Sequence, residues 1–148
     1  MLFRSLGAKL PQRDCALTPH PGELARMLKR EIADIQGDRF AAARAASEEL
    51  AHPTLLKGAY TVSASSGQPL LINPTGNPGM ATGGMGDALS GIIGTLLAQK
   101  LAPADALATG AYWHGLAGDL CEQEIGSVGY SATDLIERLP RARACILV

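Results

Sequence analysis

The sequence is poor in the residue types on which several classes of protein depend. It has two Phe, one Trp and three Tyr, too few for an aromatic-rich binding module. Its three cysteines, Cys15, Cys121 and Cys145, are far apart and form no CxxC pair, which argues against a disulfide framework or a zinc site. With 13 basic and 14 acidic residues the formal net charge is -1, so we expect neither nucleic acid nor an anionic membrane as a partner.

Long apolar runs are also missing. The longest, over 88–98, is interrupted by two glycines, a serine and a threonine, and it falls short of the roughly 18–20 residues that cross a bilayer. The apolar patch within residues 1–14 is too short and too interrupted for a signal peptide. We therefore expect a cytoplasmic protein with no membrane segment, in keeping with the unpaired cysteines.

Glycine, by contrast, is abundant. Seventeen glycines and a hydrophobic content of 47% are typical of a globular α/β domain with many tight turns. The length suits one domain that buries a core of its own. The sequence contains no internal repeat and no low-complexity linker, so we expect residues 1–148 to form a single unit.

Hydrophobic periodicity and helix-capping signals predict five helices. The last of them begins at a possible capping box formed by Ser131 and Asp134, and Pro140 is expected to end it. Pro103 suits the first turn of the helix before it. The expected helices are 23–35, 38–51, 88–99, 103–124 and 132–139.

Short apolar segments between turn residues predict strands. A turn at Ser66-Gly67 joins two of them into a hairpin. We expect a mostly parallel sheet flanked by helices, in which the consecutive strands near 54–73 pair antiparallel at one edge. The expected strands are 14–18, 54–58, 60–65 and 69–73.

The segment that joins the last strand to an apolar helix is the most unusual part of the sequence. Six glycines lie between positions 76 and 91. Glycine allows a ligand to approach the main chain closely, and the free N–H groups at a helix start bind anions without help from Lys or Arg. Gly84, Met85 and Gly86 stand where such N–H groups converge. We expect a phosphate to bind there.

Asp87 follows this expected anion site directly. A carboxylate there would repel a phosphate unless it had another task, and accepting the proton of a hydroxyl that attacks phosphorus is such a task. The alternative is that Asp87 only complements the helix dipole. After TGGMG and before a small apolar helix, we favour the general base.

Two better-known glycine motifs do not fit this segment. A phosphate-binding loop of the GxxxxGK[ST] type needs a lysine at its end, where this loop has Asp87-Ala88. The dinucleotide motif GxGxxG needs a strand that runs directly into the glycines, and here Pro74 and Pro78 intervene. The loop is therefore of another kind.

Several motifs together resemble one family. The segment NPTGNPGMATGGMGDALSG (73–91) resembles the signature of the ribokinase-like NAD(P)H-hydrate dehydratases, and TPHPGEL (18–24) resembles their second signature. LLKGAYT (55–61) is similar to their nucleotide-contacting turn, and the likeness continues through 111–119 and 131–140. The resemblance implies the C-terminal part of a ribokinase-like three-layer α/β/α sandwich.

The resemblance also implies an activity. Hydrated NADH and NADPH would be repaired by phosphorylation of the ring hydroxyl with ADP or ATP, accompanied by Mg²⁺, followed by elimination. Asp87 would be the catalytic base and would also contact the substrate, together with His20 and Asn77. The adenine nucleotide would be bound by two segments, namely Lys57, Gly58, Ala59, Tyr60 and Thr61 in the first and Gly84, Met85 and Gly86 in the second. No protein metal ligands and a homo-oligomer are expected.

From the residues alone, these side chains have simpler alternatives. His20 between two prolines is preorganised for ligand contact, but it could be an exposed turn residue. Lys57 ends a strand, where sheet enzymes place ligand-binding groups, or it is a surface lysine. Glu23 caps the helix that it opens, and Asn77 either contacts substrate or shapes the turn. His114, on an apolar helix face, is expected to be a core residue with its hydrogen bonds satisfied.

Two other functions fit part of the pattern. A small-molecule hydroxyl kinase of the same superfamily would use the same loop, although HPGE together with NPGMATGG favours the dehydratase. A non-catalytic nucleotide-binding fragment is the other alternative, since nothing in the chain resembles the N-terminal half of the longer family members. Tyr60 also departs from the family, which often has a small residue there.

Overall fold

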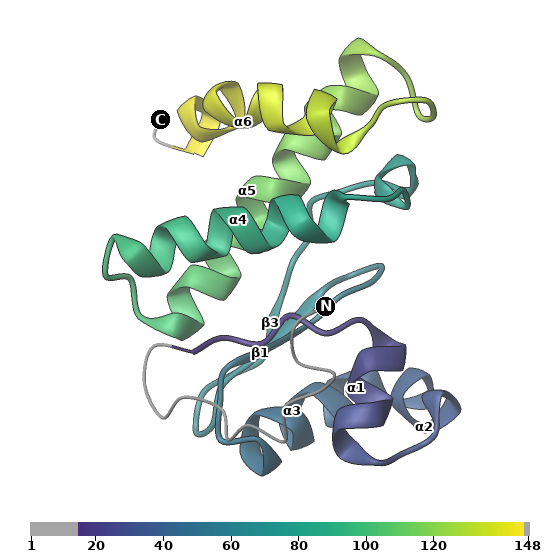
Figure 1. The fold of residues 1–148 in the computed structure, drawn as a ribbon, viewed down its shortest axis with the longest axis vertical. Helices are drawn as coiled ribbons and strands as arrows, with labels where there is room; N and C mark the ends of the chain where they lie inside the picture. Colours follow the sequence, from purple (N-terminus) through teal and green to yellow (C-terminus); the bar gives the residue numbers. More distant parts are fainter. Residues whose placement is uncertain (1–14, 147–148) are drawn as a thin grey trace.

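The computed structural model describes residues 15–146 and arranges them in three layers (Figure 1). One layer contains helices α1 (Pro21–Leu28), α2 (Ile32–Gly37) and α3 (Arg39–Glu49), and the other contains α4 (Met85–Ala98), α5 (Pro103–Glu124) and α6 (Ala132–Ile146). A small sheet lies between them. The expected α/β/α layering is confirmed. The expectation of no signal peptide concerns residues 1–14, which lie outside the described residues.

The sheet is antiparallel over its three strands, β1 (Thr54–Leu56), β2 (Val62–Ala64) and β3 (Leu71–Ile72). The expected antiparallel pairing of the strands near 54–73 is confirmed, whereas the expectation of a mostly parallel sheet is wrong for the described residues. The turns between these strands are too short for the crossover that parallel strands need. Among the described residues, parallel pairing occurs only at the bridge between Leu17 and Thr54. Between these two residues the chain crosses over through α1–α3.

The strands are shorter than expected, but their side chains alternate between the two helical layers. Leu56 and Val62, paired in the ladder, pack with Leu24 and Ile35 on the layer of α1–α3. Leu55 points the other way and packs against α4 and α5. Both leucines of β1 are fully buried, and each such burial stabilises the fold by roughly 1.5–3 kcal/mol.

The predicted helix over 23–35 is two helices. The chain turns at Lys29, whose φ of 54° is left-handed, and the N–H of Arg30 donates to the carbonyl of Ala25 (2.9 Å). This turn lets α2 fold back, so that Ile35 packs in the same cluster as Leu24. A straight helix would carry Ile35 away from this cluster.

The last helix continues past Pro140, which was expected to end it. Packing explains the difference, because Leu135 and Ala142 on either side of the proline are both fully buried in the cluster with α5. The indole N–H of Trp113 donates to the carbonyl of Leu139 (2.8 Å). The capping box at the start of the helix is confirmed, since Ser131 and Asp134 bond each other reciprocally.

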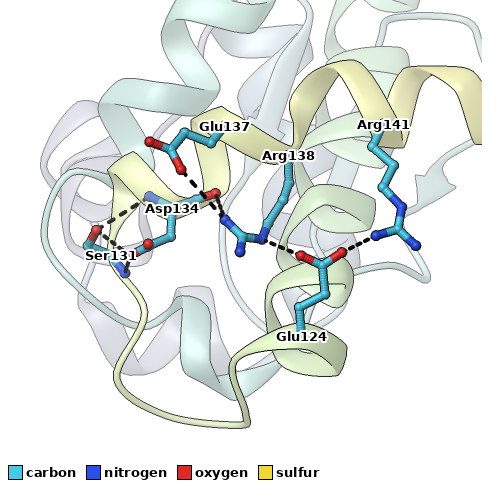
Figure 2. A network of polar contacts seen from close by, with 6 residues as sticks. All are labelled: Glu124, Ser131, Asp134, Glu137, Arg138 and Arg141. Carbon is cyan, nitrogen blue, oxygen red and sulfur yellow. Dashed lines mark hydrogen bonds and ion pairs between the residues drawn. The ribbon is translucent and has the colours of Figure 1, made fainter.

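Ion pairs fasten the same helix to the end of α5 (Figure 2). Arg138 and Arg141 both pair with Glu124, the last residue of α5, and the Arg138 contact measures 3.1 Å. Arg138 also donates to the carbonyl of Asp134 (2.9 Å). These contacts join the end of α5 to α6. None of the helices within residues 15–146 is long and apolar enough to cross a membrane.

Candidate functional site

The N-terminal ends of α1 and α4 face the same side of the molecule, at the right in Figure 1. The segment that follows β1 ends on that side too, and contacts join the three. The ammonium of Lys57 lies 3.7 Å from the carboxylate of Glu23 in α1. A Cβ added to Gly86 in α4 would lie 3.4 Å from the same ammonium. Three segments far apart in the sequence therefore meet around Lys57.

His20 is the N-cap of α1, and Glu23 bonds back to it. The N–H of His20 donates to the Glu23 carboxylate (2.8 Å), and the N–H of Glu23 donates to Nδ1 of His20 (3.2 Å). The imidazole remains exposed, with its other nitrogen 3.6 Å from Glu23. The local structure therefore places His20 at the edge of the site with its ring accessible to a ligand.

Glu23 does more than cap the helix. Partial burial would raise the pKa of its carboxyl, but the His20 backbone N–H and the charge of Lys57, with smaller contributions from His20 and Arg26, lower it overall. The carboxylate therefore stays ionised and holds the Lys57 ammonium beside Gly86. The sequence motif showed the cap but gave no sign of this pairing with Lys57.

The turn over 57–61 has an unusual backbone. Gly58 has a φ of 144° and Tyr60 a φ of 51°, and the Thr61 hydroxyl donates to the Gly58 carbonyl (2.9 Å). The Tyr60 side chain is 74% exposed, so it points away from the protein rather than filling the turn. The turn therefore presents Lys57 and open backbone to a ligand.

Arg39, at the start of α3, supports this turn from below. Its guanidinium donates to the carbonyls of Leu56 (3.3 Å) and Lys57 (3.2 Å), and partial burial lowers its pKa. The φ of Gly58 favours glycine, and a Cβ there would come within 2.8 Å of the guanidinium and displace the end of the Arg39 side chain. Arg39 belongs to an alanine-rich, charged helix, and no sequence signal distinguishes it from a surface arginine.

The start of α4 has the form expected of an anion site. Gly84 is its N-cap with a left-handed φ of 85°, and no side chain caps the helix. The first-turn N–H groups of Met85 and Gly86 therefore have no acceptor within the helix. The Met85 side chain is buried and anchors this end, whereas Asp87 is exposed in the first turn.

Asn77 lies on the approach to that helix with both ends of its side chain engaged. Its carbonyl oxygen accepts from the Tyr130 hydroxyl (2.5 Å) and the Gly79 N–H (3.0 Å). Its amide donates to the carboxylate of Asp119 (3.2 Å). Of the two interpretations from the sequence, this geometry supports the one in which Asn77 shapes the turn.

A cavity of about 90 Å³ opens beside the turn, between the β2–β3 hairpin and α5. Thr61 forms part of its wall and connects it to the turn. Most of the remaining wall is apolar, which suits a flat ring more than a charged group. The cavity is lined by Leu55, Thr61, Ser63, Leu71, Ile72, Asn73, Pro74, Ala108, Ala111 and Tyr112.

His114 of α5 is buried beneath the start of α4, as expected, but the expectation that its hydrogen bonds are satisfied is wrong. Its Nε2 is enclosed and has no hydrogen-bond partner among the described residues. Burial lowers its pKa from 6.5 to about 4, and the backbone of Met85 opposes this shift only in part. The ring is therefore neutral at ordinary pH.

Comparison with known proteins identifies the arrangement. The sequence model of a family described as NAD(P)H-hydrate dehydratase matches residues 5–141, nearly the whole chain. The chain belongs to the NAD(P)H-hydrate dehydratase family. It is 48% identical over 125 residues to the bifunctional NAD(P)H-hydrate repair enzyme Nnr of Escherichia coli (strain K12). It is 42% identical over 114 residues to the ADP-dependent (S)-NAD(P)H-hydrate dehydratase of Neisseria meningitidis serogroup B.

The solved structures of the family have the same fold. The Bacillus subtilis ADP/ATP-dependent NAD(P)H-hydrate dehydratase, co-crystallized with ATP/Mg²⁺, superposes with a TM-score of 0.83 at 35% identity and covers 88% of this chain. A ribokinase-like superfamily protein from Enterococcus faecalis superposes with a TM-score of 0.71 at 31% identity and covers 87% of it. The expected ribokinase-like fold is confirmed.

This family member spans only part of its relatives. The alignments take in 84% of this chain but 24% of the Escherichia coli protein, and 77% of it but 38% of the Neisseria protein. In the Bacillus structure the chain corresponds to 47% of the protein. The expectation that the chain represents one part of the family's fold is thus confirmed.

Within this part, the predicted site residues fall into three groups. Lys57 and Gly86 meet directly, and Asp87 follows Gly86 in the same turn of α4. His20 joins them through Glu23. Asn77 stands apart, with its polar atoms bound within the protein. The nucleotide and substrate roles of these residues stay predictions.

Proposed function

We propose that the protein dehydrates hydrated NADH and NADPH back to NADH and NADPH at the expense of ADP or ATP. The observation that carries this proposal is that the Lys57 ammonium lies beside Gly86 at the uncapped start of α4, with Asp87 in the same first turn. A cation and open backbone N–H groups at a helix start, with a carboxylate in the first turn of that helix, are the groups that phosphoryl transfer to a hydroxyl requires. The family assignment supports the choice of substrate, because the curated relatives are named as hydrate dehydratases or hydrate repair enzymes.

The nucleotide would lie across the two glycine-containing segments. Its terminal phosphates would accept from the N–H groups of Met85 and Gly86 and pair with the Lys57 ammonium. The helix dipole of α4 adds to the attraction. The open backbone of Gly58–Thr61 would hold the rest of the nucleotide. Thr61 leads into the apolar cavity, which we assign to the adenine ring.

Asp87 would start the reaction as a general base. It accepts the proton of the substrate hydroxyl as that oxygen forms a bond to the terminal phosphorus, and the bond from phosphorus to the nucleotide leaving group breaks. The phosphorylated oxygen then departs as phosphate when its bond to ring carbon breaks, and loss of a ring proton restores the double bond. The exposed imidazole of His20 would contact the hydrated dinucleotide.

Mg²⁺ is expected with the nucleotide. Residues 15–146 contain no group of three His, Cys, Asp or Glu side chains that could hold a metal ion. This suits Mg²⁺, which is commonly bound through phosphates and waters with only one or two carboxylates. Asp87, in the first turn of α4, and Glu23, which pairs with Lys57, are carboxylates beside the proposed phosphate site. When bound, the ion would neutralise charge on the phosphates.

We further propose that residues 1–148 act as part of a single domain whose remaining portion corresponds to the rest of the longer relatives. A cytoplasmic location and a homo-oligomeric assembly complete the proposal, and size-exclusion chromatography with light scattering tests the assembly. A hydroxyl kinase would use the same loop on another alcohol. Because the chain matches hydrate dehydratases, the hydroxyl kinase is the second candidate.

The deciding experiment is an activity assay on the full-length natural protein. Hydrated NADH is supplied with ADP or with ATP in the presence of Mg²⁺, and recovery of the reduced-nicotinamide absorbance is followed. We expect recovery with at least one nucleotide and none without nucleotide. Nucleotide turnover on another small alcohol, with no recovery of NADH, would instead establish the kinase. Absence of both recovery and nucleotide binding would refute the proposal.

A further inference from the structure

Asp119 of α5 lies at the centre of a polar cluster to which the proposed mechanism gives no role. Both of its carboxylate oxygens accept from the N–H of Gly76 (3.0 and 3.1 Å). One of them also accepts from the side-chain amide of Asn77 (3.2 Å). The carboxylate thus holds two successive residues of the segment that leads to α4.

Tyr130 completes the cluster from the loop between α5 and α6. Its hydroxyl donates to the carbonyl oxygen of Asn77 (2.5 Å), and its side chain is only 4% exposed. A Cβ on Gly79 would come within 2.6 Å of the Tyr130 ring, so the ring also lies directly against the backbone. Burial raises the pKa of the phenol, which keeps it a donor to Asn77.

The surface of α5 is shaped to receive the same segment. A Cβ on Gly115 would lie 2.7 Å from the carbonyl carbon of Thr75, and one on Gly118 would lie 2.8 Å from Cγ of Met80. The Thr75 hydroxyl donates to the Tyr112 carbonyl (3.0 Å). Residues 75–80 are therefore seated on α5 along their whole length by close backbone contact and by hydrogen bonds.

The importance of this seat follows from what comes next in the chain. Only Ala81–Gly84 separate the seated segment from the N–H groups at the start of α4, and all four residues are exposed. Their own packing therefore contributes little to fixing them. The Met85 side chain anchors one end of this stretch, and the seated segment anchors the other.

We propose that Asp119 is a positioning residue for the anion site: by holding Gly76 and Asn77 it fixes the loop from which the N–H groups of Gly84–Gly86 are presented. Tyr130 assists through Asn77. The catalytic consequence rests on the proposed function, whereas the positioning itself does not. N–H donors stabilise a transferring phosphoryl group only when they are placed correctly beforehand, and a displacement of 1 Å can cost about 100-fold in rate.

The test compares three variants of the full-length natural protein. Asp119→Asn removes the negative charge and replaces one carboxylate oxygen by an amide NH₂. This NH₂ cannot accept from the Gly76 N–H or from the Asn77 amide, which both donate to Asp119 in the wild type. Tyr130→Phe keeps the ring and removes only the bond to Asn77. Glu122→Gln is the control, since it makes the corresponding charge change on the same helix. The Glu122 carbonyl accepts from Gly126, but its side chain makes no hydrogen bond or ion pair among the described residues.

Amide hydrogen exchange reads the positioning directly and needs no activity. We expect faster exchange in peptides covering 76–87 for Asp119→Asn, a smaller increase for Tyr130→Phe and none for Glu122→Gln. Peptides from α1–α3 should exchange as in the wild type. Unchanged exchange over 76–87 in both Asp119→Asn and Tyr130→Phe would overturn the proposal, as would faster exchange spread evenly over the whole chain. If Asp119→Asn fails to fold, Tyr130→Phe alone decides between these outcomes.

Kinetics then separates positioning from a merely structural role. For Asp119→Asn we expect kcat per folded molecule to fall about 10- to 100-fold, with the nucleotide KM changed by less than about threefold. A structural role would lower the amount of folded protein and leave kcat unchanged, and that result would overturn the catalytic part of the proposal. A wild type with no dehydratase activity would refute the proposed function. Hydrogen exchange would still test whether Asp119 positions residues 76–87.

Discussion

His114 makes the stability of the fold depend on pH in a way that can be calculated. Its ring is buried with one nitrogen unpartnered, and its folded-state pKa lies near 4 instead of 6.5. The unfolded chain therefore binds a proton at a pH where the folded protein does not. Stability from this group is complete above pH 6.5 and is lost as the pH falls toward about 4.

The size of the effect follows from the shift. The difference between 6.5 and about 4 corresponds to a total of about 3 kcal/mol. Between about pH 7 and about pH 5, roughly 2 kcal/mol of this should already be lost. Glu23 contributes little in this range, because its carboxyl has a pKa below the ordinary 4.5. The effect is thus separable from titration of that carboxylate.

Urea denaturation at about pH 7 and about pH 5 measures the effect, with His114→Phe as the comparison because it keeps a planar ring that does not titrate. We expect the loss of unfolding free energy between the two pH values to be about 2 kcal/mol smaller in the variant than in the wild type. His114→Asn, which opens a cavity but likewise cannot titrate in this range, should show the same reduction. Equal pH dependence in the wild type and both variants would refute the argument.

Two further predictions, made with three substitutions, concern the packing of the fold and the charges around the site. Gly115→Ala should destabilise the protein by about 1–3 kcal/mol, because its Cβ would press on the Thr75 backbone, whereas Gly94→Ala, with nothing within 4 Å, should stabilise α4 by up to about 1 kcal/mol. Thermal melting measures both variants, and an equal change of Tm in the two would contradict the close packing of Gly115 against Thr75. Glu23→Gln should lower stability above pH 4.5 but not well below it, because the wild-type carboxylate pairs with Lys57 only while ionised. A stability difference between Glu23→Gln and wild type that is independent of pH would show that the pairing does not matter.

Local signals accounted for the site better than for the sheet. The glycines around 84–86 predicted an uncapped, open helix start because glycine restricts which conformations and contacts are possible there. The run of apolar residues before Lys57 likewise placed Lys57 at the end of a buried strand. The antiparallel pairing near 54–73 was expected and is present, whereas the parallel strands expected beside it are represented among the described residues by a single bridge between Leu17 and Thr54.

The helix boundaries show where local signals lose to tertiary packing. Lys29 adopts a left-handed conformation although it is neither glycine nor asparagine, the residues that favour it. The break between α1 and α2 therefore could not be predicted from the sequence. Pro140 should end a helix, but Leu135 and Ala142 gain enough from burial against α5 to carry the helix across it. Both departures depend on contacts between residues that are distant in sequence.

The supporting residues of the site could not be found from sequence for the same reason. Arg39 reaches the turn after β1 from another helix, and Asp119 reaches Gly76 across 43 positions. An acidic residue on a long helix or an arginine on a charged one resembles any surface residue. Such residues become recognisable only when the fold brings them against the motif that they support.

The central claim is that Asp87 is the general base, and Asp87→Asn tests it most directly. The change keeps the shape of the side chain and removes the proton acceptor. Asp105→Asn is the matched control, because it makes the same change in the first turn of α5, where the exposed Asp105 can only favour the helix dipole. Both variants are assayed in the full-length protein for recovery of NADH from its hydrate, and nucleotide binding is measured by calorimetry.

For Asp87→Asn we expect the rate to fall by about 10²–10⁴-fold, with nucleotide affinity unchanged or slightly higher because a negative charge beside the phosphates is gone. Asp105→Asn should keep the wild-type rate. Wild-type activity in Asp87→Asn would remove Asp87 from catalysis and contradict the mechanism proposed for this site.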